Sequence, residues 1–158
     1  MSFIATGGPT ASPDTETIPN AAWWPDVSMQ AFREASRIDR TAPDEQVRTA
    51  LVSAISNVNA QINGWLGNQL ALNTGATKLA DLPDPPGQAE GWYAERYLRA
   101  VHSAADALLT ESYRDFDSTA EGHQRADAME GRIDAYRRES QYAIADITGR
   151  PRRRVELL

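Results

Sequence analysis

The sequence predicts an all-α protein, a helical bundle of three long helices and one short helix with an extended N-terminal arm and a C-terminal tail. Two observations carry this prediction. Apolar residues recur at three- and four-residue spacing over long stretches of the 158-residue chain, and no stretch alternates for long enough to suggest a sheet. We therefore expect a flexible arm over residues 1–22, a helical domain over residues 23–149 and a basic and apolar tail over residues 150–158.

The composition is that of a globular domain, with 41% hydrophobic and 24% charged residues. The absence of cysteine excludes disulfides, thiolate zinc sites and cysteine nucleophiles. The net charge of −6 divides unevenly, because residues 148–158 carry +3 and the rest of the chain −9. An acidic body argues against a broad nucleic-acid-binding face and leaves a local basic contact open. We expect no signal peptide and no membrane span, since no apolar run approaches the roughly 18 residues that a span requires.

Residues 1–22 are rich in Gly, Pro, Ser and Thr and contain only two charged residues. Such a segment cannot bury enough apolar surface to offset its ordering entropy, so we expect it to be disordered or ordered by a partner. Trp23 and Trp24 follow, directly before Pro25 and Asp26. We expect this aromatic pair to pin the arm to the bundle, either as core or as part of an interface.

The first two helices have recognisable starts. A short helix is expected over residues 29–37, with Asp26 or Ser28 as its N-cap. The second is expected to begin near Asp44, behind an early proline, and to fade between residues 64 and 72. Its apolar positions are Val47, Leu51, Ile55, Val58, Ile62 and Trp65 or Leu66.

Two further long helices follow a linker over residues 73–89, where three prolines within residues 83–86 exclude a helix. The third helix is expected over residues 90–114, and its broad apolar face is typical of a central helix. The fourth opens at a capping box over residues 118–121 and stops at Gly149. The apolar face of the third helix comprises Tyr93, Tyr97, Leu98, Val101, Ala104, Ala105, Leu108 and Leu109. The seam of the fourth comprises Ala126, Met129, Ile133, Tyr136, Ser140, Ala143 and Ile147.

No catalytic or metal-binding pattern is recognisable. The chain has two histidines, His102 and His123, and neither completes the Glu-x-x-His pattern of di-iron bundles, because Arg99 and Ala120 precede them. We expect His102 to be a structural residue on the flank of the third helix. Serine elbows, phosphate-binding glycine loops and HExxH are also missing. We therefore expect no enzyme, no metal and no cofactor. An acid/base enzyme built in a bundle is kept as an alternative.

The tail combines four arginines with an apolar end. Three interpretations stay open from the residues alone: a solvated terminus, a phosphate contact that reads no base sequence, or addition of residues 155–158 as a strand to the sheet edge of a partner. The candidate partner-binding residues are Arg150, Pro151, Arg152, Arg153, Arg154, Val155, Glu156, Leu157 and Leu158.

A series of short motifs runs through the chain from about residue 23 to the end. They are Trp24-Pro25-Asp26-Val27, Thr41-Ala42-Pro43, Asn57-Val58-Asn59-Ala60, residues 75–83, Tyr93-Ala94-Glu95-Arg96, Tyr113-Arg114, Asp117-Ser118-Thr119-Ala120, Gly122, Ala126-Asp127 and Gly149-Arg150-Pro151-Arg152. In their order and spacing they resemble the head completion protein (protein L) family of P2-like tailed phages. No single motif is specific, and the arm before Trp23 has no clear counterpart in the family.

The resemblance implies a structural virion protein that joins the portal vertex after DNA packaging, stabilises the filled head and offers a platform for the tail. Related connector proteins form rings on a dodecameric portal, and their C-terminal tails pair with it. This favours strand addition by Arg150–Leu158. The implied partners are the portal protein, further copies of the chain, a tail terminator or tail-completion protein and, non-specifically, packaged DNA, without a membrane. The implied location is the portal vertex of the virion, after assembly in the host cytoplasm.

A ring requires contacts between different patches of neighbouring subunits. We expect these contacts at Trp23 and Trp24, and between the acidic flank of one helix and Arg132, Arg137 and Arg138 of the next subunit. The alternative function is a helical adaptor that contacts nucleic acid through its C-terminal arginines, Arg150–Arg154.

Overall fold

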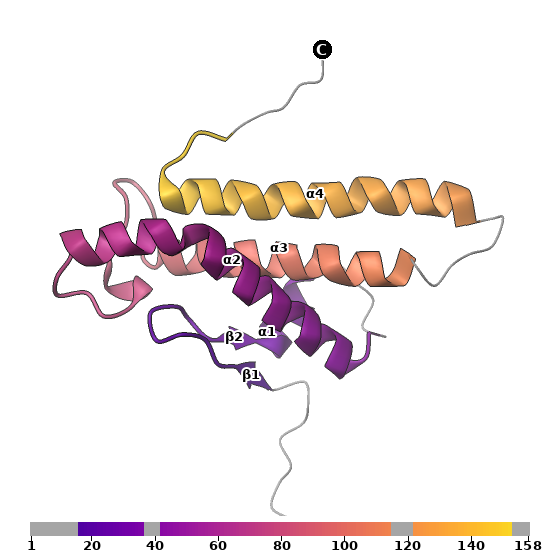
Figure 1. The fold of residues 1–158 in the computed structure, drawn as a ribbon, viewed down its shortest axis with the longest axis horizontal. Coiled ribbons are helices and arrows are strands. Elements are labelled where there is room, and N and C mark those ends of the chain that lie inside the picture. The colour runs from indigo at the N-terminus through magenta and orange to yellow at the C-terminus, as the bar shows by residue number, and fades with distance from the viewer. Residues whose placement is uncertain (1–15, 37–41, 115–121, 153–158) are drawn as a thin grey trace, which may run out of the picture.

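The structure is a computed structural model that describes residues 16–36, 42–114 and 122–152 (Figure 1). These residues are mostly helical, which confirms the predicted class. No helix in the described ranges is long and apolar enough to cross a membrane. The elements are β1 (Thr17–Ile18), β2 (Val27–Ser28), α1 (Met29–Ala35), α2 (Asp44–Leu72), a 3-10 turn η2 (Leu79–Asp81), α3 (Trp92–Arg114) and α4 (Gly122–Thr148).

The helices α3 and α4 form an antiparallel pair, and α2 crosses α3 obliquely (Figure 1). The oblique course of α2 departs from the nearly antiparallel arrangement of three long helices that the sequence pattern predicts. The helix α3 packs against both of the others, as the breadth of its apolar face predicts. Its fully buried residues Tyr97, Val101 and Ala105 belong to the same core cluster as residues of α2 and α4.

The predicted helix seams supply nearly half of the buried hydrophobic residues. In α2, the five apolar positions from Val47 to Ile62 are all buried, and Trp65 and Leu66 are half-buried. In α4, the buried seam residues are Ile133, Ser140, Ala143 and Ile147, whereas Met129 and Tyr136 are half-buried. The side chain of Ala126 and the capping box over residues 118–121 lie outside what the structure describes.

Leu108 differs from the prediction, because it is 37% exposed although its position is on the apolar face of α3. The oblique course of α2 explains the difference. It leaves a cavity of about 170 Å³ between α2 and α4, and Leu108 lines this cavity together with Asn57 and Gln141. The sequence pattern of α3 cannot show this opening, because it depends on the angle between the helices.

The segment before α1 packs on the helices as a small hairpin. Ile18 of β1 pairs with Val27 of β2 in antiparallel register, and both side chains are buried. Residues 17–22, which the sequence analysis assigned to the flexible arm, therefore include part of the core. Neither strand is predicted from the sequence, since pairing of only two residues on each side leaves no recognisable alternation.

The helix ends are set by local hydrogen bonds. Ser28 caps α1, with its Oγ accepting from the backbone N–H of Ala31 at 3.2 Å, and α1 ends at Ala35, two residues before the predicted end. The start of α3 is capped from a distance, because the Asp84 carboxylate accepts from the backbone N–H groups of Gly91 at 2.9 Å and Trp92 at 3.0 Å.

Candidate docking site at the start of the tail

The end of α4 fixes where the tail begins. Gly149 has a φ of 65°, the left-handed conformation that favours glycine. Its backbone N–H donates to the carbonyl of Asp146 at 3.3 Å, and that of Arg150 donates to the carbonyl of Ala145 at 3.0 Å. These two bonds form a Schellman motif, and Pro151 cannot continue the helix. The chain therefore turns sharply at Gly149.

Arg152 ties the first residues of the tail to the side of α4. Its Nε and Nη2 donate to the two carboxylate oxygens of Asp146 at 3.0 and 2.8 Å. Its guanidinium lies over the Tyr142 ring, 5.2 Å from the ring centroid. The hydrogen bond to Asp146 raises the pKa of Arg152. Two-point binding holds a planar guanidinium in one orientation, so it also sets the direction of the chain.

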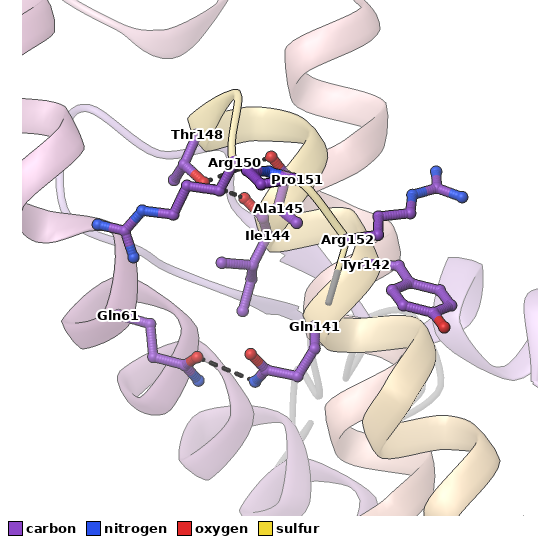
Figure 2. A pocket seen from close by; sticks show the side chains of 9 residues that line it. All are labelled: Gln61, Gln141, Tyr142, Ile144, Ala145, Thr148, Arg150, Pro151 and Arg152. Carbon is purple, nitrogen blue, oxygen red and sulfur yellow. Dashed lines mark hydrogen bonds between the residues drawn. The ribbon is translucent and has the colours of Figure 1, made fainter. Parts of the chain in front are cut away.

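A cavity of about 700 Å³ lies beneath the turn, at the junction of α2 and α4 (Figure 2). Gln141 of α4 donates to Gln61 of α2 at 2.9 Å across it. Figure 2 shows Arg150 directed toward the Gln61 side of α4 and Arg152 toward Tyr142 on the other side. The two arginines therefore present their charges on opposite flanks of the helix.

Three of the predicted tail residues lie in the described part of the chain: Arg150, Pro151 and Arg152 are all exposed. The other six, Arg153, Arg154, Val155, Glu156, Leu157 and Leu158, lie outside the described residues. Binding of the tail to a partner stays a prediction.

Trp23 and Trp24 lie in the core, with exposed fractions of 7% and 6%. Trp24 stacks on Tyr97 of α3, with ring centroids 5.0 Å apart and planes inclined by 10°. The carbonyl of Trp23 accepts from the backbone N–H of Leu79 at 2.8 Å, which ties η2 to the hairpin. The pair therefore attaches the N-terminal segment to the helices. A contact of these residues with a neighbouring subunit stays a prediction, and little of their surface is left for it.

A part-buried polar network beside Trp24 is not predicted from the sequence. Asn20 donates from Nδ2 to the Tyr97 hydroxyl at 2.7 Å, the hydroxyl donates to Oδ1 of Asn59 at 2.7 Å, and Asn59 donates back to Oδ1 of Asn20 at 3.0 Å. Burial raises the pKa of Tyr97 to about 12. Asn59 falls within a motif of the sequence, whereas Asn20 lies before the first motif, and only the fold shows that they meet.

The three arginines predicted at a subunit interface occupy different flanks of α4. Arg137 pairs with Glu111 of α3 on one flank. Arg132 lines a cavity of about 570 Å³ on the other flank, together with Asp106 of α3. Arg138 is exposed and forms no ion pair with any residue in the described ranges. They do not form a single patch.

Two titratable side chains of α3 lie near α1: Asp106, which is buried, and His102, which is half-buried. His102 packs edge-on against Phe32, with ring centroids 5.4 Å apart, and burial lowers its pKa to about 4. Asp106 accepts from Oγ of Ser36 at 2.6 Å, and burial raises its pKa to about 6 against the opposing effect of Arg132. No group of three possible metal ligands occurs among the described residues.

Comparison with known proteins identifies the family. A family model for the phage head completion protein (GPL) matches residues 18–158. The chain is 33% identical over 144 residues to the head completion/stabilization protein of Escherichia phage P2, which covers 91% of this chain and 84% of that protein. It is 26% identical over 151 residues to the probable head completion/stabilization protein of Haemophilus phage HP1, covering 96% and 98%. No solved structure matches the chain.

These matches support a structural role in head completion and a location in the virion, and the matched family is not a family of enzymes. They also confirm the resemblance drawn from the motifs. The chain belongs to the phage head completion protein (GPL) family.

Proposed function

We propose that the protein docks as a ring on the portal of the filled phage head, with residues 150–158 of each subunit as the anchor. The observation that carries the proposal is the start of the tail, where the turn at Gly149 and the binding of Arg152 to Asp146 hold exposed residues on the surface of α4. The anchor pairs with an exposed sheet edge of the portal through residues 155–158. The opposite side of the ring receives the tail terminator or tail-completion protein.

The free energies of ordering and of hydrogen bonding favour docking as a ring over docking of single subunits. Ordering each residue of the tail costs about 1–2 kcal/mol in backbone entropy. Each new hydrogen bond returns only about 0.5–1.5 kcal/mol net. One nine-residue tail therefore binds weakly. Subunits joined side by side present many tails at high effective concentration, so docking and ring formation support each other. The ring matches a dodecameric portal in symmetry.

The subunits join through contacts between unlike patches, because a closed ring uses a heterologous interface. Arg138 is the best placed of the three predicted interface arginines, since Arg137 is paired with Glu111 and Arg132 lines a cavity within its own subunit. The acidic flank of a neighbouring helix supplies the opposite charge.

Ring formation on the portal is expected to weaken with salt. Raising the salt from about 0.1 M to about 1 M shortens the Debye length from about 10 Å to about 3 Å, which screens exposed charge pairs. The number of subunits per portal, measured by sedimentation velocity, should fall, and Arg138→Glu should lower it at low salt. Ring formation that is indifferent to both changes would rule out charge-mediated lateral contacts.

Sedimentation with the cognate portal ring tests the docking. The full chain is expected to co-sediment with the portal, whereas a chain that ends at Gly149 is not. A chain that ends at Arg152 is the matched control, because it retains the Arg150 hydrogen bond and the Arg152–Asp146 pair and lacks only the last six residues. Circular dichroism establishes that all three are equally helical. Equal binding by the full chain and both truncated chains would contradict an anchor in the tail.

The second candidate is a contact between Arg150–Arg154 and the phosphates of DNA. It is favoured by Arg150, which is exposed and forms no ion pair within the part of the chain that the structure describes. A DNA affinity that falls steeply with salt and disappears without residues 150–158 would support this candidate. Retention of DNA binding by the chain that ends at Gly149 would exclude it.

A further inference from the structure

Charged side chains line one flank of the contact between α3 and α4, which we call the charged groove. Each pair of opposite charge joins the two helices: Arg96 with Asp146 at 3.9 Å, Arg99 with Glu139 at 3.1 Å, and Arg132 beside Asp106. The α4 members follow each other at intervals of seven residues, which places them on one face of the helix, about two turns apart. The groove therefore follows α4 from Asp146 back to Arg132.

The described part of the tail ends on this groove. Arg152 is bound to Asp146, the first α4 residue of the groove, and lies over Tyr142, one turn further along it. Figure 2 shows the chain doubling back over α4 after the turn, so that Arg152 lies beside Tyr142. Arg152, the last described residue, therefore lies beside Tyr142, about one turn of α4 from Glu139.

The far end of the groove is hollow. A cavity of about 570 Å³ lies there, lined by residues of α1, α3 and α4. Asp106 is only 7% exposed, yet it forms part of the cavity wall, and Tyr136 lines the α4 side. Tyr142 and Arg132 are ten residues apart, about 15 Å along a helix. Six extended residues span about 20 Å, so the segment after Arg152 is long enough to reach the cavity.

We propose that residues 153–158 occupy the charged groove of their own subunit in the free protein. Charge matches along its length: Arg153 and Arg154 fall near Glu139, and Glu156 falls beyond them, toward Arg132. The apolar residues of the segment cover Tyr136 and the adjoining wall of the cavity.

Because the tail is also the proposed portal anchor, its binding to the groove regulates docking on the portal. This consequence rests on the proposed function. A tail that occupies its own groove is available to a partner only for the fraction of time that it is released, and its apparent affinity falls by that fraction. Free subunits are thereby held back from pairing with one another through their tails. The portal overcomes the contact because it presents a competing sheet edge at many adjacent positions.

Paramagnetic broadening on the free protein tests the placement without the portal. Because the chain has no cysteine, Leu158→Cys provides a single attachment point for a nitroxide label. In the ¹⁵N-labelled protein, the amide signals of Ser103, Tyr136 and Glu139 are expected to lose most of their intensity, whereas those of Val52 and Leu70 on the exposed face of α2 keep theirs. Uniform loss, or loss on α2 alone, would overturn the proposal.

Matched charge reversals sharpen this test. Glu139→Lys should restore the groove signals, and about 0.5 M salt, with a Debye length of about 4 Å, should do so in part. Asp134→Lys makes the same charge change on an exposed α4 residue outside the groove, beside Arg137, and should leave the broadening intact. Equal effects of the two variants would overturn the proposal. So would broadening that appears only when labelled and ¹⁵N-enriched subunits are mixed, since the tail would then bind a second copy.

The outcome is independent of docking. Selective broadening in a protein that fails to co-sediment with the portal would leave the groove contact standing and remove the proposed function. Co-sedimentation without selective broadening would leave the proposed function standing and remove the groove contact.

Discussion

Replacing Trp24 with alanine is expected to lower the free energy of unfolding by about 3–5 kcal/mol, the range for truncating a large buried aromatic side chain. The indole is 6% exposed and stacks face to face on Tyr97. It also holds the hairpin over α2 and α3, so a cavity at this position would separate two layers of the core. Urea unfolding followed by circular dichroism measures the loss without relying on tryptophan fluorescence.

Trp65→Ala is the matched control for this substitution. Trp65 is half-buried near the end of α2 and lies tilted against Tyr93, with ring centroids 5.6 Å apart. The same truncation there should cost clearly less, because part of the lost surface is already in contact with water. If Trp65→Ala destabilised the protein as much as Trp24→Ala, the central role of Trp24 in the core would be wrong.

A smaller substitution separates packing from the polar network. Tyr97→Phe keeps the ring beneath Trp24 and removes the hydroxyl that links Asn20 to Asn59. The deletion removes two hydrogen bonds between part-buried groups, each of which contributes about 0.5–1.5 kcal/mol net. Comparing the losses of unfolding free energy in Trp24→Ala, Trp65→Ala and Tyr97→Phe therefore tells whether stacking or hydrogen bonding contributes more to the attachment of the hairpin.

The long helices could be predicted from the sequence because each carries its own signal. A seam at three- and four-residue spacing defines which face of α4 is buried whatever lies opposite, and Ile133, Ala143 and Ile147 are buried as expected. Gly149 and Pro151 mark the end of α4 in the same local way. Such signals need no knowledge of the rest of the fold.

Features that depend on two distant segments left no such signal. The pairing of Ile18 with Val27 is too short to produce alternation, and the oblique course of α2, which exposes Leu108, depends on how two helix surfaces fit together. The contact between Asn20 and Asn59 likewise exists only after the hairpin has docked. Pairing at long range is set by packing, which periodicity in one segment does not record.

The candidate docking site likewise combines features that the sequence predicts with contacts that it does not. The sequence showed the arginines of the tail and the helix stop before them. The binding of Arg152 to Asp146 was not predicted, although its signal was present: a carboxylate in the last turn of a helix, followed after the stop by an arginine long enough to reach back. The charged groove could not be predicted without the alignment of α3 with α4, because its pairs join residues 26 to 50 positions apart.

Lowering the pH from 7 to 4 is expected to destabilise the Asp106→Asn variant by about 2–3 kcal/mol more than the parent protein. The reason is a pair of opposed titrations on α3. Burial lowers the pKa of His102 from 6.5 to about 4, so between these values the unfolded chain binds a proton that the folded protein does not. The folded state therefore loses stability as the pH falls through this range.

Asp106 acts in the opposite direction. Burial raises its pKa from 3.8 to about 6, so the folded protein binds a proton before the unfolded chain does, and the folded state gains stability as the pH falls from 6 to 3.8. In the parent protein the two changes nearly cancel. Asp106→Asn removes the gain and leaves the loss due to His102.

Urea unfolding at pH 7, 5.5 and 4 measures these changes. His102→Leu is the complementary variant, and its stability relative to the parent should rise as the pH falls, because only the gain due to Asp106 remains. All other titrating groups are shared by the three proteins and drop out of the differences between them. Parallel stability profiles for the parent and Asp106→Asn would mean that Asp106 titrates normally in the folded state, and that Ser36 and Arg132 offset its burial completely.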